Sequence, residues 1–430
     1  MQTELAILAL LVAGYGLIAA RLDRLSVGPA LAFLAIGILL ADDVLGPISL
    51  EPAAEPIRVL AEVTLMLLLF ADASTIRARA LERDAVPVGR LLVIGLPLTI
   101  ILGIVVAIVL FPGLPPGLLL LIAATLAPTD AALGQAVVSN AAVPARVRRL
   151  LNVESGLNDG IATPFVFLAL ALTAAESTGG SGWLAEALTE LVIGIGVGTG
   201  LGYLGGSLLR LAEQRSWTSS VSRQLFVLAL AASCYLVSIG AGGNGFIAAF
   251  VGGLAFGGGS RGQEHDAVRF TELQGSVLAI GVWIAFGLTV AGRLRTDLWD
   301  PTAIGYAVLS LTIIRMVPVA IALVGARFRL STVLFIGWFG PRGLASIVFM
   351  IIGIEGLAEA GVDAGPFTAV VAWTVLLSVI LHGLSAGPLA ARYGRRVADL
   401  PSGSPEREDD VEPRPTRVWW AGETPPGPDH

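Results

Sequence analysis

The sequence predicts an all-α polytopic membrane protein with about thirteen transmembrane helices. Of the 430 residues, 55% are hydrophobic and 14% are charged, whereas soluble domains carry about 25% charged residues. Apolar runs long enough to cross a bilayer, which takes about 20 residues, follow one another along the chain. Proline and glycine interrupt two of these runs. Composition and run length together argue against a soluble globular protein.

Short polar stretches separate the apolar runs and define the expected helices. The runs fall at residues 4–20, 27–41, 57–76, 86–111, 117–139, 148–174, 185–212, 222–240, 244–259, 268–292, 301–325, 332–354 and 365–391. Sustained hydropathy over such lengths is the usual signature of a membrane span. Because the number is odd, the two chain termini are expected on opposite sides of the membrane.

The arginines predict the orientation. All 27 basic residues are Arg, and alternate loops carry nineteen of them on one side of the spans and three on the other. Cytoplasmic loops are rich in basic residues, so we expect the N-terminus outside the plasma (inner) membrane and the C-terminus in the cytoplasm. The net charge of −6 lies mostly in the C-terminal tail and predicts no nucleic-acid partner. The single Cys234 permits no disulfide within the chain.

Residues 396–430 are expected to form a cytoplasmic tail. From Pro401 onward the chain is rich in proline and acidic residues, a composition that cannot build a packed core, so we expect disorder. Trp419 and Trp420 in this segment would meet solvent, the membrane surface or a partner.

The run at 148–174 carries the most unusual polar residues. Within it, Glu154 shares a helix face with Asn158, and Ser155 shares one with Asp159, because residues four apart lie one above the other. An acid in the hydrocarbon core costs about 3 kcal/mol on insertion scales. Two acids in one span therefore favour a functional site over packing.

Two other spans are expected to be broken. Pro128 interrupts the fifth span and leaves Thr129 and Asp130 in the gap, because proline lacks an N–H and disfavours helix at the preceding residue. Asp130 would also cap the second half-helix. The twelfth span is interrupted by Gly340, Pro341 and Gly343, with Arg342 between them. Interrupted helices at matching places in two inverted halves indicate a binding site near the midplane.

These residues suggest a site where a cation and a proton compete. A buried carboxylate such as Asp159 can be tuned to hold one or the other. Ser155, the Asp130 carboxylate and freed backbone carbonyls would supply further oxygen ligands, and Asn158 would brace Glu154 or the neighbouring backbone. If a single carboxylate carries the exchange, one Na⁺ moves for each H⁺ and transport is electroneutral.

The remaining buried charges have expected structural roles. Arg315 stays charged and needs an anion, for which Glu154 is the natural partner. Arg342 would neutralise the half-helix ends at its break. Asp72 would complete the site or face the cytoplasmic funnel, whereas Glu62 and His382 are expected to be helix-contact residues. The three histidines, His265, His382 and His430, form no metal-binding pattern.

Three motifs, in this order and spacing, resemble the NhaP/NHE branch of the monovalent cation/proton antiporters. They are APTDAALG at 127–134, NVESGLNDG at 152–160 and GPRGLAS at 340–346. The resemblance covers residues 1 to about 395. Asp72 stands where the family usually has Glu, and Ala131 stands where the usual TDP has Pro.

The resemblance implies an NhaA-like antiporter fold with an inverted repeat, crossed broken fifth and twelfth helices, a homodimer and elevator-type movement. It implies dimer-scaffold helices in 1–85 and 214–295, core helices in 86–175 and 296–395, a linker helix in 176–213 and the tail at 396–430. By position, it implies that Asp159 binds the ion or the proton beside Asn158. Asp130, Thr129 (through its backbone oxygen) and Ser155 would be Na⁺ ligands. Glu154–Arg315 would be the stabilising pair, with Pro128 and Arg342 supporting the broken helices. No cofactor is expected beyond the transported Na⁺ (or Li⁺) and H⁺.

Three alternatives remain open. A K⁺/H⁺ exchanger of the same fold would differ only in the dimensions of the site. An intramembrane aspartyl protease would use Asp130 and Asp159 as two acids that share a proton, but the tyrosine- and glycine-flanked motifs usual for that chemistry are absent. A channel or passive scaffold is disfavoured by the acids at two broken helices and by the lack of a selectivity-filter pattern.

Overall fold

The helices of the computed structural model follow the predicted apolar runs. The structure describes residues 2–24, 27–42, 44, 46, 55–75, 78–261, 265–293, 299–401 and 404–407. Trp419 and Trp420 lie outside these residues. The all-α prediction is confirmed.

The first half of the described chain contains ten α-helices and one π-helical turn. They are α1 (Gln2–Arg24), α2 (Pro29–Leu40), α3 (Glu55–Thr75), α4 (Ala78–Arg90), η1 (Leu91–Gly95), α5 (Leu96–Leu110), α6 (Pro116–Thr125), α7 (Gln135–Val138), α8 (Ala145–Thr178), α9 (Trp183–Gln214) and α10 (Ser220–Gly240).

The second half contains the other seven α-helices and a short 3-10 helix. They are α11 (Gly245–Gly259), α12 (His265–Arg293), α13 (Pro301–Leu311), α14 (Ile313–Ala322), α15 (Leu330–Trp338), α16 (Leu344–Glu359), α17 (Gly365–Ala398) and η2 (Pro405–Arg407).

Each predicted run corresponds to one helix or to consecutive helices. The fifth run forms α6 and α7, and the twelfth forms α15 and α16, each pair separated by a non-helical stretch. The run at 301–325 is divided into α13 and α14 at Thr312, whose backbone leaves the helical region. Within the described residues, seven helical segments are long and apolar enough to cross a membrane. The chain is therefore a multi-pass membrane protein.

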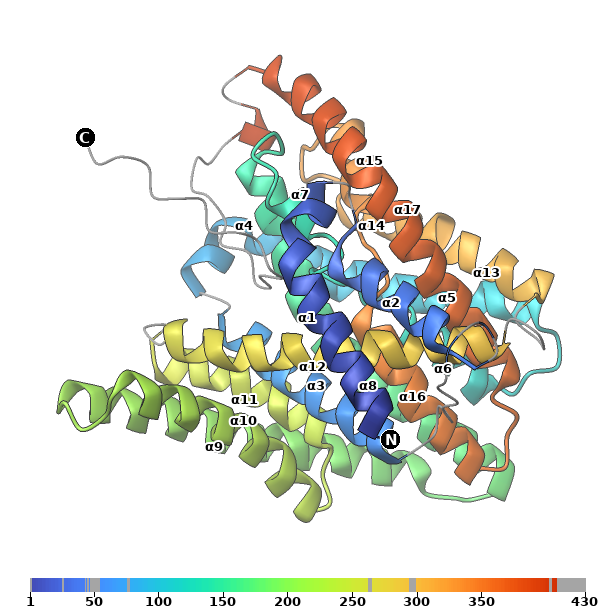
Figure 1. Cartoon of the computed structure of the whole chain (residues 1–430), viewed down its shortest axis with the longest axis horizontal. Coiled ribbons are helices and arrows are strands. Elements are labelled where there is room, and N and C mark those ends of the chain that lie inside the picture. The colour runs from blue at the N-terminus through green and yellow to red at the C-terminus, as the bar shows by residue number, and fades with distance from the viewer. Residues whose placement is uncertain are drawn as a thin grey trace.

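The helices pack in two groups (Figure 1). In the first group, α9, α10 and α11 pack with α3 and α12, and α2 lies on α12. In the second group, α6 contacts both α5 and α8, α13–α17 form a connected set, and α13 and α14 also contact α5. Contacts of α3 with α8 and α16, and of α12 with α16, join the groups. The expected linker helix, α9, packs closely on α11.

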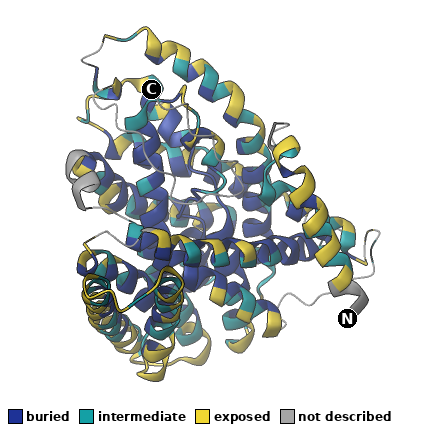
Figure 2. Ribbon diagram, turned by 60° about the vertical axis from the view of Figure 1, so that its left-hand side comes forward, coloured by how far each residue is buried: buried dark blue, intermediate teal, exposed yellow. Residues whose placement is uncertain are grey.

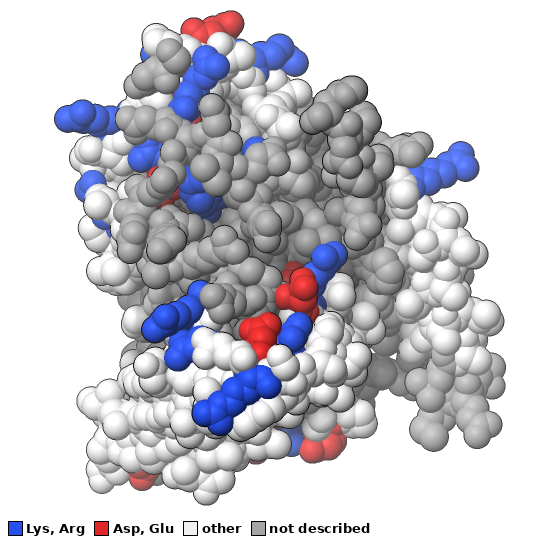
Figure 3. Space-filling model, turned by 90° about the vertical axis from the view of Figure 1, so that its left-hand side faces the viewer, with Lys and Arg blue, Asp and Glu red and all other residues white. Residues whose placement is uncertain are grey.

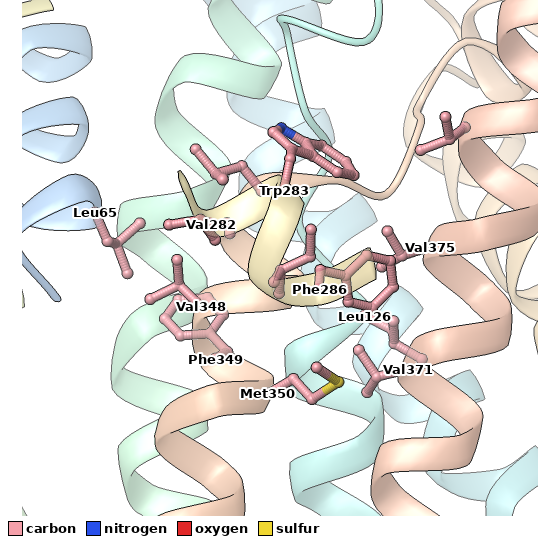
Figure 4. Close-up of a cluster of buried hydrophobic side chains, with 14 of the residues drawn as sticks. Leu65, Leu126, Val282, Trp283, Phe286, Val348, Phe349, Met350, Val371 and Val375 are labelled. Carbon is pink, nitrogen blue, oxygen red and sulfur yellow. The ribbon is translucent and has the colours of Figure 1, made fainter. Parts of the chain in front are cut away.

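Apolar side chains from both groups meet in the interior. Figure 4 shows Leu65 of α3 and Phe286 of α12 beside Phe349 of α16 and Val371 of α17. All four side chains are buried. Figure 2 shows buried residues throughout the middle of the molecule and exposed residues on the outward faces of the helices. On the face drawn in Figure 3, the described charged side chains gather at the top and in the middle, and described uncharged residues lie mainly at the lower left and on the right.

A row of glycines brings α9 into backbone contact with α11. A Cβ atom on Gly198, Gly202 or Gly206 would overlap backbone atoms of α11. These residues recur every four positions, so they form one stripe along α9. Small residues at such an interface let two helices approach closely, which is how helices associate within lipid.

Two polar contacts at one end of the molecule differ from the expectations. Arg146 and Arg149, expected in a solvated loop, belong to α8 and donate to the two carboxylate oxygens of the buried Asp84 at 2.9 and 2.7 Å. The chain after Pro401 was expected to be disordered, yet Glu406 is buried and accepts from Thr332 and from the Arg329 amide. These hydrogen bonds offset the polar composition of this short segment. Residues 408–430 lie outside the described residues.

The glycine stripe generates a stability prediction. Gly202→Leu would force side-chain atoms into the backbone of α11, and overpacking of this kind costs about 1–3 kcal/mol. We expect a melting temperature several degrees below that of the unmodified protein in detergent. Gly200→Leu is the matched control, because a Cβ at Gly200 meets nothing within 4 Å. Equal melting temperatures for the two variants would contradict the packing described here.

Candidate functional site

The two broken helices meet at their breaks. α6 ends at Thr125 and α7 begins at Gln135, so the stretch that contains Pro128 and Asp130 is non-helical. The Asp130 amide donates to Pro341 O, in the gap between α15 and α16, at 2.8 Å. Backbone of this kind is tolerated at membrane depth only when it is buried in protein or lines a cavity. Here one non-helical stretch supplies a hydrogen-bond acceptor for a backbone amide of the other.

The Asp130 carboxylate extends this connection. One oxygen accepts from the Ala132 amide at 2.7 Å, and the other accepts from the Leu344 amide at 2.7 Å. Asp130 was expected to cap the second half of its own broken helix. It accepts from the Ala132 and Leu133 amides of the turn that leads into α7, and it also caps the first residue of α16, where its negative charge faces the positive end of the helix dipole. A Cβ at Gly343 would overlap this carboxylate, so a glycine is required there.

Thr129, Ser155 and Asn158 form a buried polar cluster beside Asp130. Thr129 Oγ1 lies 2.9 Å from Ser155 Oγ and accepts from Asn158 Nδ2 at 2.7 Å. Asn158 was expected to brace Glu154 or backbone, whereas it holds the Thr129 hydroxyl. Asn158 Oδ1 is buried and has no hydrogen-bond partner among the described residues. An unsatisfied carbonyl oxygen in a buried cluster is the kind of ligand a hard monovalent cation prefers.

Asp159 and Asp72 are brought near this cluster by α8 and α3. Asp159 is 2% exposed and lies one helical turn after Ser155. Asp72 is 1% exposed, and its Cβ lies 3.9 Å from the position a Cβ on Gly156 would occupy. α8 therefore presents Ser155, Asn158 and Asp159 within two turns, with an α3 carboxylate beside the same stretch.

Arg315 and Glu154 form a bidentate ion pair. Arg315 Nη1 donates to Glu154 Oε1 at 2.6 Å, and Nη2 donates to Oε2 at 2.9 Å. Both side chains are almost completely buried, at 4% and 3% exposure. The pair ties α14 to α8 next to the polar cluster. Gly340 permits its close approach, because a Cβ there would overlap the Arg315 guanidinium.

Arg342 is fully buried in the break between α15 and α16. Its Nη1 donates to Gly340 O at 3.0 Å, and its backbone amide donates to Ser378 Oγ of α17 at 2.7 Å. The guanidinium thus lies against a carbonyl of the non-helical stretch, where positive charge is stabilising. Arg342 and Arg315 together place two positive charges beside the site carboxylates.

A cavity of about 370 Å³ reaches the breaks from the side of α2. Its lining includes Asp130, Leu344, Trp283 and His382. Asp159 is not among the lining residues. Glu62, expected as a helix-contact residue, receives hydrogen bonds from Arg58 and from Tyr235 of α10.

Sequence reasoning expected His382 of α17 to be a helix-contact residue, which agrees with its contact to α15, but it missed Ser378 and Ser385 on the same face. Ser378, His382 and Ser385 recur at intervals of four and three residues and all contact α15 or the break that follows it. This helical spacing of polar residues within an apolar span was the available signal. Sequence reasoning also missed Asp84, whose importance depends on arginines more than sixty residues away.

Comparisons with known proteins concern the family and the fold. A family model described as "Sodium/hydrogen exchanger, transmembrane" matches residues 7–392. The solved structure of the sodium proton antiporter MjNhaP1 from Methanocaldococcus jannaschii at pH 8 superposes with a TM-score of 0.74 at 22% identity, covering 92% of this chain and 100% of that one. This likeness shows the shared fold.

Curated relatives carry two kinds of name. Na(+)/H(+) antiporter 2 of Zygosaccharomyces rouxii is 30% identical over 257 residues, which are 56% of this chain and 31% of the relative. K(+)/H(+) antiporter NhaP2 of Shewanella oneidensis is 27% identical over 424 residues, which are 96% of this chain and 70% of the relative. The chain spans less than a third of the length of the antiporters of Z. rouxii and Saccharomyces cerevisiae that it matches.

The buried ion pair generates a second stability prediction. Glu154→Ala leaves the Arg315 guanidinium buried without its carboxylate, and breaking such a pair costs about 3–5 kcal/mol. We expect a marked fall in melting temperature in detergent. The double variant Glu154→Leu/Arg315→Leu removes both charges and should recover much of this loss. A Glu154→Ala protein with a normal melting temperature and no transport would instead make Glu154 a direct participant in ion binding.

Proposed function

This chain belongs to the sodium/hydrogen exchanger family, and we propose that it exchanges Na⁺ or Li⁺ for H⁺ across the plasma membrane. The observation that carries the proposal is the cluster of Thr129, Ser155 and Asn158 next to Asp130, where two helix breaks meet, on the same stretch of α8 as Asp159. The family and its structural neighbours are transporters rather than enzymes, which sets the protease alternative aside.

Competition for Asp159 provides the coupling. A buried carboxylate is costly when ionised, so the unloaded site favours uptake of either a cation or a proton. In this proposal oxygens of Asp130, Ser155, Asn158 and Thr129 would coordinate a dehydrated Na⁺. Protonation of Asp159 removes the charge that attracts the cation. The two ions therefore bind alternately.

The charges at the breaks favour one-for-one exchange. In the helices proposed to move, Asp130, Glu154 and Asp159 contribute three carboxylates, and Arg315 and Arg342 contribute two guanidiniums; Asp72 lies on α3, outside this unit. One negative charge remains, and one Na⁺ or one H⁺ neutralises it. A neutral loaded unit crosses the membrane interior at lower cost than a charged one.

Elevator-type movement fits the two packing groups. α5–α8 and α13–α17 would move as the core and carry the site, α1–α3 and α10–α12 would form the scaffold of a homodimer, and α9 would link the two halves. In this arrangement Asp72 of α3 stays with the scaffold and faces the site from outside the moving unit. The arginine-rich loops support a cytoplasmic C-terminus.

The exchange proposal is tested in proteoliposomes with an acidic interior. Addition of Na⁺ or Li⁺ should release protons and restore the fluorescence of a quenched pH dye, whereas Asp159→Asn should abolish this response and still yield a folded protein. Asp363→Asn, a change at an exposed carboxylate, is the matched control. Exchange retained in Asp159→Asn would overturn the assignment. A response to K⁺ that exceeds the Na⁺ response would support the alternative suggested by the names of the Shewanella relatives.

Electroneutrality is tested by clamping the membrane potential. With K⁺ on both sides and valinomycin present, the rate of Na⁺-driven proton release at a fixed pH gradient should match the rate without valinomycin, since equal charges move in each direction. The exchanged ions should also obey a ratio near one when null-point gradients are measured. A rate that changes with the imposed potential would show that a net charge crosses the membrane in each cycle.

A further inference from the structure

Three polar side chains of α17 hold the end of α15 and the break beyond it. His382 Nε2 lies 2.8 Å from the carbonyl oxygen of Trp338, the last residue of α15. Ser378 Oγ accepts from the Arg342 amide at 2.7 Å. Ser385 Oγ accepts from the Trp338 indole at 3.0 Å. One face of α17 therefore forms hydrogen bonds to backbone on both sides of Phe339, Gly340 and Pro341.

His382 contacts both Trp338 and Ser378. A neutral imidazole carries one N–H, so His382 donates either to Trp338 O or to Ser378 O, according to its tautomer. Its Nδ1 lies 2.9 Å from Ser378 O and 3.3 Å from Ser378 Oγ. The ring also packs against the Trp338 indole, with centroids 5.1 Å apart. His382 is 2% exposed, so these hydrogen bonds have little competition from water.

The backbone of the α15–α16 break in turn holds Asp130 through hydrogen bonds. Pro341 O accepts from the Asp130 amide, and the Leu344 amide donates to the Asp130 carboxylate. Both groups lie within two residues of Arg342, whose amide Ser378 binds. A shift of the break would therefore move both partners of Asp130. Thr129, the next residue toward the N-terminus, would move with it.

We propose that His382 and Ser378 are positioning residues for cation binding, because together they fix the α15–α16 break that holds Asp130 in place. Neither residue touches the cation. The role rests on the proposed exchange function, and it goes beyond a helix contact. In this proposal α17 sets the geometry of the site without contributing a ligand to it.

The experiment compares four variants with the unmodified protein in proteoliposomes. His382→Leu introduces an apolar side chain of moderate size and removes both ring nitrogens. His382→Gln keeps an amide that can donate to Trp338 O, and Ser378→Ala removes the acceptor for Arg342. Thr374→Val is the matched control, because Thr374 is buried one turn earlier on α17 and bonds only to Val370 O of its own helix.

We expect His382→Leu and Ser378→Ala to raise the KM for Na⁺ about fivefold, which corresponds to about 1 kcal/mol, with a smaller change in maximal rate. His382→Gln should restore the KM to within about twofold, and Thr374→Val should leave it unchanged. A KM equal to that of Thr374→Val in both disruptive variants, or no rescue by Gln, would overturn the inference. If His382→Leu does not fold, Ser378→Ala and His382→Gln decide the outcome.

A second measurement does not depend on transport. Amide hydrogen exchange of residues 338–344 should be faster in His382→Leu and Ser378→Ala than in the unmodified protein and in Thr374→Val. Unchanged exchange in this segment would show that α17 does not fix the break. Absence of Na⁺-driven proton release by the unmodified protein would instead refute the proposed function, so the two failures are distinguishable.

Discussion

The arrangement of this molecule depends on one requirement: backbone that leaves a helix inside a membrane must find partners in the protein. Pro128 and Pro341 each create such a stretch, and the two stretches satisfy one another. Asp130 is the link, because its amide donates to Pro341 O and its carboxylate accepts from the Leu344 amide. A single residue therefore joins segments more than two hundred positions apart.

Charge balance follows from the same junction. The break brings Arg342 into the interior, where it lies on Gly340 O, and Arg315 is held by Glu154 from α8. These guanidiniums allow several carboxylates to remain buried near one another. What is left is a small negative excess beside a cluster of hydroxyl and amide oxygens. This excess of carboxylates over guanidiniums agrees with the proposed transport of a monovalent cation or a proton.

Much of the fold could be predicted from local patterns. Apolar run lengths located the helices, and Pro128 and Pro341 located both breaks, because proline acts on its own turn of helix. Glu154 was the expected partner of Arg315, and the structure joins them. Long-range contacts were less accessible. The cap that Asp130 provides for α16, the Asp84 pairs with α8 arginines and the burial of Glu406 all depend on which distant segment lies opposite. The polar spacing on α17 was visible, but its target was not.

The short η2 helix extends the folded part of the chain beyond Pro401, where the composition predicted disorder, to Arg407. Glu406 binds the first turn of α15, and Arg146 of α8 donates to Pro405 O at 2.6 Å. Residues 404–407 thus serve as a cross-brace between the two helices that lead into the site. A truncation designed from composition, ending near Pro401, would delete this brace and strip the Arg329 amide of its acceptor. Fusion partners and affinity handles are better attached beyond Arg407, where the brace is left intact.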